Sequence, residues 1–384
     1  MRTSISTSIS DIDPGAWNAL DSGGAPFLRH AFLAGLEATG CVGGRTGWIP
    51  APITLHDGHG LAAAAPAYIK THSFGEFVFD FSWAQAYAQH DLAYYPKLVL
   101  GVPFTPATAP RLLLRPGVDP VATRAALVRA IEDFAHQRAL SSVHGLFVTA
   151  DEREAFARAG WLARFDVQFH WANRGYRDYD HFLEEFTARF RKNAKRERRR
   201  IQEAGLTCGT LLGPDLDQRT VDEVYDLHRD TFLRHGNEPY LTRAFFRLLP
   251  QALGEQFMIK RARLGDETVA ASVFYWNDEA LYGRYWGTRE QFHSLHFELC
   301  YHQGIDFCIE RGIRRFEPGT QGEHKVSRGF VPQRTWSTHW IVDPRFRHAI
   351  AEYLRREAAH VANYADDINR HVPYRDDRRE ARSK

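Results

Sequence analysis

The pattern of apolar and polar positions divides the chain into two successive blocks of mixed helical and strand-like segments. In the first block, apolar residues recur at helical spacing over four segments that we expect to be helices: 11–21, 27–39, 121–138 and 151–160. Runs rich in β-branched and aromatic residues predict strands at 48–55, 61–69, 77–81, 98–102, 143–148 and 167–172.

The second block begins with a predicted helix over 180–204, which ends at Gly205. The elements expected after it are a strand at 206–212, helices at 215–235 and 241–253, and strands at 256–263, 268–276 and 280–286. The block closes with a helix at 294–311, a strand at 313–317, an irregular segment at 318–333, a strand at 335–342, a helix at 346–363 and a charged tail to 384.

Both blocks share one order: helices, an antiparallel meander of three strands, a crossover helix and further strands. This order predicts an α/β protein with mixed sheets. It resembles an acetyltransferase fold of the GNAT type that occurs twice, with an N-terminal domain over 1–175 and a C-terminal domain over 176–384.

Composition is that of an ordinary globular protein, since 44% of the 384 residues are hydrophobic and 25% are charged. No apolar run reaches the roughly 18–20 residues of a membrane-spanning helix, and the first residues lack the apolar core of a signal peptide. We therefore expect no membrane span and a cytoplasmic location. The four cysteines form no C-x-x-C pair, which favours reduced thiols.

The net charge of +2 hides a strongly basic segment. Eight of the twelve residues over 189–200 are Lys or Arg. A helix so charged repels itself unless anions lie near, so the segment indicates a phosphate-rich partner: a tRNA acceptor stem, the pyrophosphate of coenzyme A or an anionic lipid surface. The residues expected to bind phosphate are Arg191, Lys192, Lys195, Arg196 and Arg199. The alternative is a solvated linker helix, paired with Glu184, Glu185 and Glu203.

A second distinctive segment, 315–330, runs from a predicted strand into two glycines and a cluster of charges. Only seven of the 49 basic residues are lysines, and one of them, Lys325, lies here. A lysine ammonium is a compact charge that can stabilise the oxyanion of a tetrahedral intermediate. The other candidates in this cluster are Glu317, Glu323, His324 and Arg328. A salt-bridged loop without catalytic function is the alternative.

A third segment, 282–287, ends a strand with aromatic residues and glycine, where open α/β sheets usually bind ligands. Arg284 and Gly287 partly match the pyrophosphate motif of acetyltransferases, and Tyr285 and Trp286 are a candidate proton relay and a candidate pocket wall. In the first block, Asp80, Trp83 and Tyr95 could form an aromatic-walled pocket with Asp80 as its polar anchor. Ordinary core packing is the alternative for both sets.

Other chemistries lack their motifs. There is no H-E-x-x-H or comparable ligand spacing, so no metal site is expected. The Walker loop, the dinucleotide fingerprint and the G-x-S-x-G elbow are likewise missing from the sequence.

Several segments together resemble the bacterial FemAB-like N-acyltransferases of the GNAT superfamily, and the resemblance runs over roughly 15–375. They are HSFGEFVFDFSWAQAYAQHDLAYYPKLVLGVPFTP (72–106), RKNAKRERRRIQEAG (191–205), LYGRYWG (281–287), LHFELCYHQGIDFCIERGI (295–313) and FEPGTQGEHKVSRGFVP (316–332). The resemblance implies tandem GNAT-like domains with a cleft at or near their junction. Better-known Fem transferases, which are more distant kin, move an amino acid from aminoacyl-tRNA to an amine of a peptidoglycan precursor. Their basic helix and late lysine correspond here to 191–200 and Lys325.

These observations lead to one hypothesis, an N-acyltransferase that moves an aminoacyl or acyl group from an activated donor to a small-molecule or peptide amine. Lys325 stabilises the oxyanion, and Glu317, Glu323, His324 or Tyr285 serves as base or relay. The basic helix holds donor phosphates, assisted by Arg284 and Arg328. No tightly bound cofactor is expected, and the co-substrate is aminoacyl-tRNA or acyl-CoA. The alternatives are an acyl-CoA-dependent N-acetyltransferase and a non-catalytic binding protein with a GNAT fold.

Overall fold

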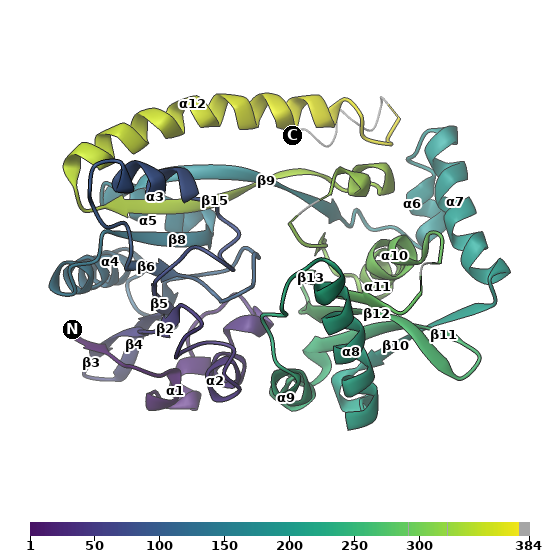
Figure 1. Cartoon of the computed structure of the whole chain (residues 1–384), viewed down its shortest axis with the longest axis horizontal. Helices are drawn as coiled ribbons and strands as arrows, with labels where there is room; N and C mark the ends of the chain where they lie inside the picture. Colours follow the sequence, from purple (N-terminus) through teal and green to yellow (C-terminus); the bar gives the residue numbers. More distant parts are fainter. Residues whose placement is uncertain (291, 321, 376–384) are drawn as a thin grey trace. The chain divides into compact units, whose positions relative to one another are not determined.

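A computed structural model of the chain describes residues 1–290, 292–320 and 322–375 (Figure 1). Two compact units divide the chain: residues 1–166 with 334–362, and residues 167–333 with 363–384. Two strands, β9 (Leu162–Ala172) and β15 (Val331–Ile341), contribute residues to both. The expected domains, 1–175 and 176–384, follow one another along the chain, whereas in the structure 334–362 return to the first unit because β15 pairs with β8 (Ser142–Val148).

The first unit combines two sheets with covering helices. A four-stranded sheet has the order β1-β3-β4-β7, and strands of a second sheet follow the order β15-β8-β6-β5-β2. The remaining strands are β1 (Arg2–Ile5), β2 (Trp48–Pro50), β3 (Ile53–Asp57), β4 (Gly60–Ala65), β5 (Ala67–Lys70), β6 (Lys97–Leu100) and β7 (Leu113–Leu114). The helices are α1 (Pro14–Asn18), α2 (His30–Ala38), α3 (Phe81–Ala88), α4 (Pro120–Gln137), α5 (Ala150–Arg158) and the first part of α12 (Pro344–Asn369).

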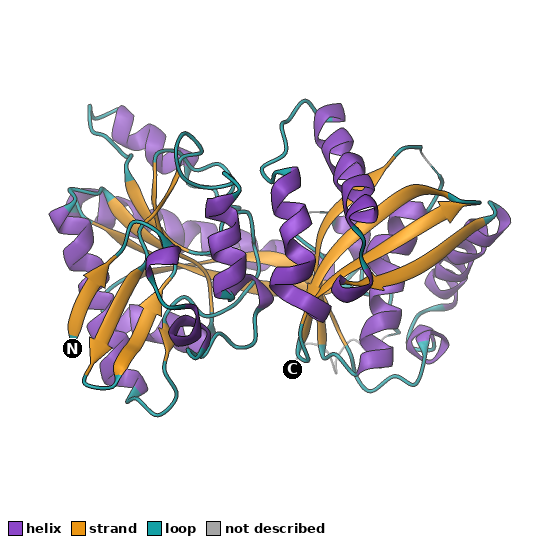
Figure 2. Ribbon diagram, turned by 90° about the horizontal axis from the view of Figure 1, so that it is seen from below, coloured by secondary structure: helices purple, strands orange, loops and turns teal. Residues whose placement is uncertain are grey.

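The second unit is a twisted sheet with helices on both faces (Figure 2). Its strands follow the order β10-β11-β12-β13-β14-β9. They are β10 (Leu206–Leu212), β11 (Phe257–Leu264), β12 (Glu267–Trp276), β13 (Ala280–Thr288) and β14 (Arg315–Glu317). The helices are α6 (Tyr179–Leu183), α7 (Ala188–Glu203), α8 (Gln218–Arg234), α9 (Arg243–Leu253), α10 (Leu295–Phe297) and α11 (Gln303–Arg311).

Both units contain antiparallel strands and one parallel pair that a helix connects. β6 pairs with β8 across α4, and β13 pairs with β14 across α10 and α11. Parallel neighbours need such a crossover, whereas short turns link the antiparallel strands β11, β12 and β13, and β10 reaches its antiparallel neighbour β11 through α8 and α9. The predicted α/β fold with mixed sheets is confirmed.

The strands β13 and β14 separate after a short ladder. They pair at only three positions, from Ala280 with Arg315 to Tyr282 with Glu317. Next to this point, β13 carries a bulge: Val273 of β12 faces Tyr285 while Phe274 faces Gly283, so Arg284 is the extra residue. A bulge bends its strand and redirects side chains. The sheet therefore opens where residues 283–286 follow the ladder.

The segment between these strands differs from the single helix predicted over 294–311. It consists of α10, a π-helical stretch over Glu298–His302 and α11. One extra residue in a helical turn shifts the faces of the residues around it. Cys300 and Tyr301 thereby contact Ser272 and His324, while Glu298 and His302 reach residues of α7.

Several expected elements are divided in the structure: the helix over 180–204 is the two helices α6 and α7, and the strands over 48–55 and 61–69 become β2 with β3 and β4 with β5. The predicted strand over 77–81 is wrong: Phe77 has a left-handed φ of 60°, and the chain turns there so that Glu76 and Asp80 both bind Lys97. The last helix continues to Asn369, beyond the predicted end at 363, and the tail over 376–384 lies outside the described residues. None of the helices in the described ranges combines the length and apolar character that crossing a membrane requires.

Candidate active site

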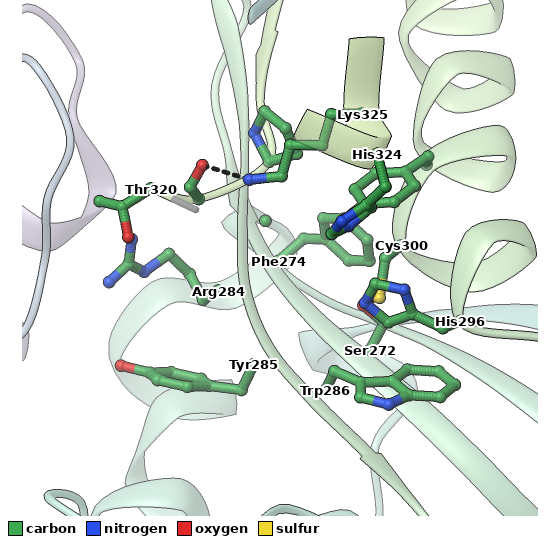
Figure 3. Close-up of a pocket in the computed structure, with 14 residues that line it drawn as sticks. Ser272, Phe274, Arg284, Tyr285, Trp286, His296, Cys300, Thr320, His324 and Lys325 are labelled. Carbon is green, nitrogen blue, oxygen red and sulfur yellow. Dashed lines mark hydrogen bonds between the residues drawn. The ribbon is translucent and has the colours of Figure 1, made fainter. Parts of the chain in front are cut away.

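A pocket of about 250 Å³ lies in the second unit where β13 and β14 separate (Figure 3). Its lining comes from β12, β13, the helical segment after β13 and the segment after β14. The lining residues are Ser272, Phe274, Gly283, Arg284, Tyr285, Trp286, His296, Cys300, Tyr301, Pro318, Gly319, Thr320, His324 and Lys325. None of these described residues is acidic, whereas Arg284 and Lys325 are basic and two more are histidines.

Lys325 is the buried cation of this pocket. Its exposed fraction is 2%, and its ammonium donates a hydrogen bond to the carbonyl oxygen of Gly319 at 2.7 Å (Figure 3). No carboxylate of the described residues lies within the 4.0 Å of an ion pair. Because burial penalises the charged form, the pKa of Lys325 falls to about 8. Lys325, which the sequence analysis singled out, is therefore placed to bind a negatively charged group of a ligand.

The strand residues expected near a ligand also line the pocket. The bulge turns Arg284 toward it, and the ring of Tyr285 packs against His228 of α8, with ring centroids 4.8 Å apart. Trp286 meets the ring of His296 edge-on at 5.2 Å. Gly287 is required here because a Cβ would lie 2.3 Å from the backbone of Leu227. The close approach of α8 thus supports this side of the pocket.

The four candidate bases occupy different environments. His324 lines the pocket, and its Nε2 lies 2.7 Å from the hydroxyl of Tyr301. Burial and the charge of Lys325 lower the pKa of His324, which keeps its ring neutral near pH 7. Glu317 is buried and bound to Arg315 at 2.8 Å, and the exposed Glu323 accepts a hydrogen bond from Tyr364, so neither carboxylate lines the pocket.

Among the pocket residues that sequence reasoning missed are Ser272, His296, Cys300 and Tyr301. Ser272 and Cys300 contact each other at 3.3 Å, and burial raises the pKa of the Cys300 thiol to about 12. Burial lowers the pKa of His296 to about 4. One sequence signal could have revealed His296 and Cys300: they are four residues apart, which is typical of one helix face, in the segment that follows an aromatic strand. It gave no reason to include Tyr301, because the π turn is not visible in sequence.

The basic helix α7 has two different faces. Its outer face exposes cations, among them Lys192, Lys195, Arg196 and Arg199; Lys195 pairs with Asp180 and Arg199 with Glu203. Arg191 is partly buried. Four of the five residues expected to bind phosphate are therefore exposed, and two of these four pair with acidic neighbours.

The inner face of α7 holds the pocket segments through Glu197. This carboxylate accepts hydrogen bonds from Arg328 at 3.1 Å and from His302 at 2.9 Å. Arg328 also donates to the carbonyl of His324 and stacks on Phe297 at 3.4 Å from the ring centre. Arg328 is only 7% exposed, so the structure gives it a supporting position behind Lys325 and not the expected exposed phosphate contact.

The candidate pocket residues of the first block belong to the first unit, whereas Trp286 belongs to the second. Asp80 is 2% exposed and binds Lys97, Ser73 and Tyr94, while Tyr95 bonds to Ser73 at 2.8 Å. Trp83 is 3% exposed and meets His339 edge-on. The carboxylate expected to anchor a ligand is thus satisfied by this buried network of protein side chains.

Comparisons with known proteins agree with this architecture. No curated protein sequence matches the chain significantly. Among solved structures, FemX covers 91% of this chain and 100% of its own at 10% identity and a TM-score of 0.55. L-PGS from Bacillus licheniformis covers 84% of this chain and 95% of its own at 10% identity and a TM-score of 0.51. These two likenesses concern the fold.

A family model covers nearly the whole sequence. Residues 8–376 match the FemAB-like model, whose description is peptidoglycan biosynthesis and recognition. This range contains every residue of the pocket and of α7. The chain therefore belongs to the FemAB-like family.

Proposed function

We propose that the chain is an N-acyltransferase that moves an aminoacyl or acyl group from an activated ester or thioester to an amine. The observation that carries this proposal is Lys325, a buried ammonium with no described counter-ion, in an acid-free pocket at the opening between two strands. A developing oxyanion supplies the missing negative charge, so the pocket binds the transition state better than the neutral carbonyl. Membership of a peptidoglycan biosynthesis family supports the same chemistry.

The reaction forms a C–N bond and breaks a C–O or C–S bond. The lone pair of the neutral amine attacks the donor carbonyl carbon, and the carbonyl oxygen becomes the oxyanion that Lys325 stabilises. Collapse of the tetrahedral intermediate expels the alkoxide or thiolate, which receives the proton that the amine loses. The cationic pocket also favours the neutral form of an incoming amine, since an ammonium would face Lys325 and Arg284.

His324 is the best placed proton relay of the sequence candidates. Its neutral ring lines the pocket and lies 2.7 Å from the hydroxyl of Tyr301. The ring can accept the amine proton and pass it to the leaving group. Tyr285 also lines the pocket, whereas Glu317 and Glu323 are bound elsewhere.

For the donor, we propose aminoacyl-tRNA. The exposed face of α7 presents Lys192, Arg196 and neighbouring cations to solvent, which suits an extended phosphate backbone. The pocket of about 250 Å³ accommodates the reacting end of a donor and leaves the rest outside. Glu197 of α7 binds His302, in the helical segment after β13, and Arg328, in the segment after β14. Donor phosphates bound to α7 would therefore lie in the same unit as Lys325.

The catalytic assignment is tested with Lys325→Ala. Transfer from a mixed pool of aminoacyl-tRNA and acyl-CoA to amines of a cell lysate is followed by mass spectrometry. We expect a loss of about 10²–10³-fold, as for other oxyanion donors. Lys260→Met is the matched control, because Lys260 is another buried lysine of this unit that lies outside the pocket. Unchanged transfer by Lys325→Ala contradicts the assignment.

The donor assignment is tested with Arg196→Glu and Arg199→Glu combined. We expect salt-sensitive binding of tRNA to weaken, while Arg219→Glu with Arg229→Glu on α8 makes the same charge change away from α7. Unaltered tRNA binding by the α7 variant contradicts the tRNA proposal and favours acyl-CoA. If the wild-type chain transfers no acyl group from any donor, the chain is a binding protein.

A further inference from the structure

The hydroxyl of Tyr301 has a single hydrogen-bond partner among the described residues. Its oxygen lies 2.7 Å from Nε2 of His324, and Tyr301 is only 3% exposed. Leaving a buried hydroxyl without a hydrogen bond is costly, so this contact holds the two side chains together. They come from segments that meet only in the folded chain, since Tyr301 belongs to the π turn and His324 to the segment after β14.

Packing fixes both partners of this hydrogen bond. The ring of Tyr301 meets Phe330 edge-on, with ring centroids 5.4 Å apart, and stacks on Phe297 at 6.2 Å. The backbone of His324 is held as well, because its carbonyl accepts a hydrogen bond from Arg328. The hydroxyl therefore meets the imidazole in one defined geometry.

The contact gives the two ring nitrogens of His324 different surroundings. Nε2 faces the buried hydroxyl of Tyr301, whereas Nδ1 has no partner among the described residues. Gly322 keeps the Nδ1 edge uncovered, because a Cβ at this position would lie 2.6 Å from Nδ1. His324 is an exposed residue that lines the pocket, so Nδ1 is the ring nitrogen left for a ligand.

We propose that Tyr301 is a positioning residue of the transfer reaction: its hydroxyl oxygen accepts a hydrogen bond from Nε2 of His324 and thereby makes Nδ1 the base. This inference rests on the proposed function, in which His324 takes the amine proton. A neutral ring that donates through Nε2 has its lone pair on Nδ1. If the hydroxyl of Tyr301 donated instead, Nδ1 would carry the ring hydrogen and could not accept another.

The same hydrogen bond supports the charged ring that forms during transfer. As the C–N bond forms, the amine gives its proton to Nδ1, and this proton passes to the alkoxide or thiolate when the C–O or C–S bond breaks. Between these events His324 is an imidazolium, and its Nε2–H points to a buried position. Tyr301 supplies the acceptor that this N–H needs there, in the way that a buried carboxylate orients the histidine of a catalytic triad.

The first test uses the wild-type chain at pH 7, where the ring of His324 is neutral. In protein with ¹⁵N-labelled histidine, NMR shows which ring nitrogen carries the hydrogen, and His324→Gln identifies the signals of His324 among the 19 histidines. We expect the hydrogen on Nε2, and in Tyr301→Phe an at least tenfold larger population with the hydrogen on Nδ1. A wild-type ring with its hydrogen on Nδ1 overturns the inference, whether or not the variant folds.

The second test asks whether Tyr301 acts through His324. In the mixed-donor assay, His324→Gln should lower the rate of transfer by about 10²–10⁴-fold, the range of a general base, and Tyr301→Phe by about tenfold. In a double-mutant cycle, Tyr301→Phe should have no further effect once His324 is replaced. Additive effects of the two substitutions overturn the inference.

Tyr176→Phe is the matched control for both tests. Tyr176 is 7% exposed, and its hydroxyl donates to Glu185 at 2.8 Å, outside the described lining of the pocket. The control removes a similar buried hydrogen bond of the same unit, so it should change neither the ring hydrogen of His324 nor the rate of transfer. Equal changes in Tyr176→Phe and Tyr301→Phe overturn the inference.

Failure of this inference is distinguishable from failure of the proposed function. If Lys325→Ala abolishes transfer while Tyr301→Phe transfers at the wild-type rate, the chain is a transferase whose base does not depend on Tyr301. If Lys325→Ala transfers at the wild-type rate, the proposed function fails and the inference falls with it, whereas the position of the ring hydrogen of His324 stands as a separate result.

Discussion

Replacement of Glu197 by Gln removes one negative charge from the contact that joins α7 to both pocket segments. The carboxylate accepts hydrogen bonds from Arg328 and His302, and the Tyr179 hydroxyl lies 2.6 Å from the other nitrogen of His302. An ionised carboxylate only accepts, so His302 donates to Glu197 through Nε2, and its other nitrogen, Nδ1, is hydrogen-bonded to the Tyr179 hydroxyl. The amide oxygen of Gln can take the place of Oε2, which accepts from both partners, but the amide nitrogen cannot accept the second hydrogen bond from Arg328, which Oε1 accepts in the wild type.

The expected cost follows from burial. The side chains of Glu197 and Arg328 are 15% and 8% exposed, so solvent screens their pairing weakly. Removing one partner of a buried pair costs about 3–5 kcal/mol, and the acceptor that Gln retains reduces this to about 2–3 kcal/mol. Glu203→Gln is the control: its pair with Arg199 is more than 60% exposed on both sides and is worth less than about 1 kcal/mol.

The dependence on pH has a defined sign. Burial alone raises the pKa of Glu197, but the hydrogen bond from His302 and the charge of Arg328 outweigh it and hold the pKa below its usual value. The stabilisation is therefore complete above the pKa of the unfolded chain and is lost as the pH falls through the lowered pKa. The difference between wild type and Glu197→Gln should be full at pH 7 and shrink in acid.

Urea denaturation followed by tryptophan fluorescence measures the free energy of unfolding. In protein labelled with ¹³C at the lysine Cε atoms, the NMR signal of Lys325 reports the pKa of this pocket residue. We expect a lower urea midpoint and a shifted pKa of Lys325 for Glu197→Gln, and neither change for Glu203→Gln. Equal midpoints for Glu197→Gln and wild type, with an unmoved Lys325 signal, would show that α7 does not support the pocket through this carboxylate.

Three further predictions concern other parts of the chain. The rate of acyl transfer should fall as the pH rises through about 8, because Lys325 loses its proton there. Lys325→Arg should move this decline in rate to higher pH. If the rates of both proteins decline at the same pH, the decline belongs to another group. Gly287→Ala should destabilise the second unit by about 1–3 kcal/mol in a urea titration, because the added Cβ would lie 2.3 Å from the backbone of Leu227. If the Gly287→Ala variant is as stable as the wild type, α8 can move away freely. Lys97→Met should lower the free energy of unfolding by about 3–5 kcal/mol, because it leaves Asp80 and Glu76 buried without their cation. In a double-mutant cycle, Asp80→Asn should recover part of this loss. Additive effects of the two substitutions would refute the ion pair.

The elements that position the pocket were predictable where periodicity is strong. The three antiparallel strands of the meander, the basic helix and Lys325 after a short strand all follow from patterns in the sequence. The roles of individual charges did not follow. In the sequence, Arg328 and Glu197 look like parts of a charged surface. In the structure they form a hydrogen bond, although Glu197 belongs to a helix and Arg328 to a segment far away in the chain. Spacing within one segment cannot show such a partner.

Local backbone irregularities explain the other differences. Phe77–Phe81 has the composition of a strand, yet a left-handed residue and two carboxylates that converge on Lys97 turn the chain. The π turn over Glu298–His302 adds one residue to a helix that looks regular in sequence. The bulge at Arg284 is equally invisible, because it exists only relative to the register of β12. Tertiary partners, and not local preferences, decide each of these sites.

The return of residues 334–362 to the first unit has a consequence for protein synthesis. Strand β8 pairs with β15 from Trp336 to Ile341, so a ribosome must complete almost the whole chain before β8 obtains this neighbour. Until then, a strand that is buried along its full length in the folded protein presents open backbone groups. A nascent chain stalled near residue 333 should therefore need a chaperone and be prone to aggregation, although it already contains every residue of the pocket.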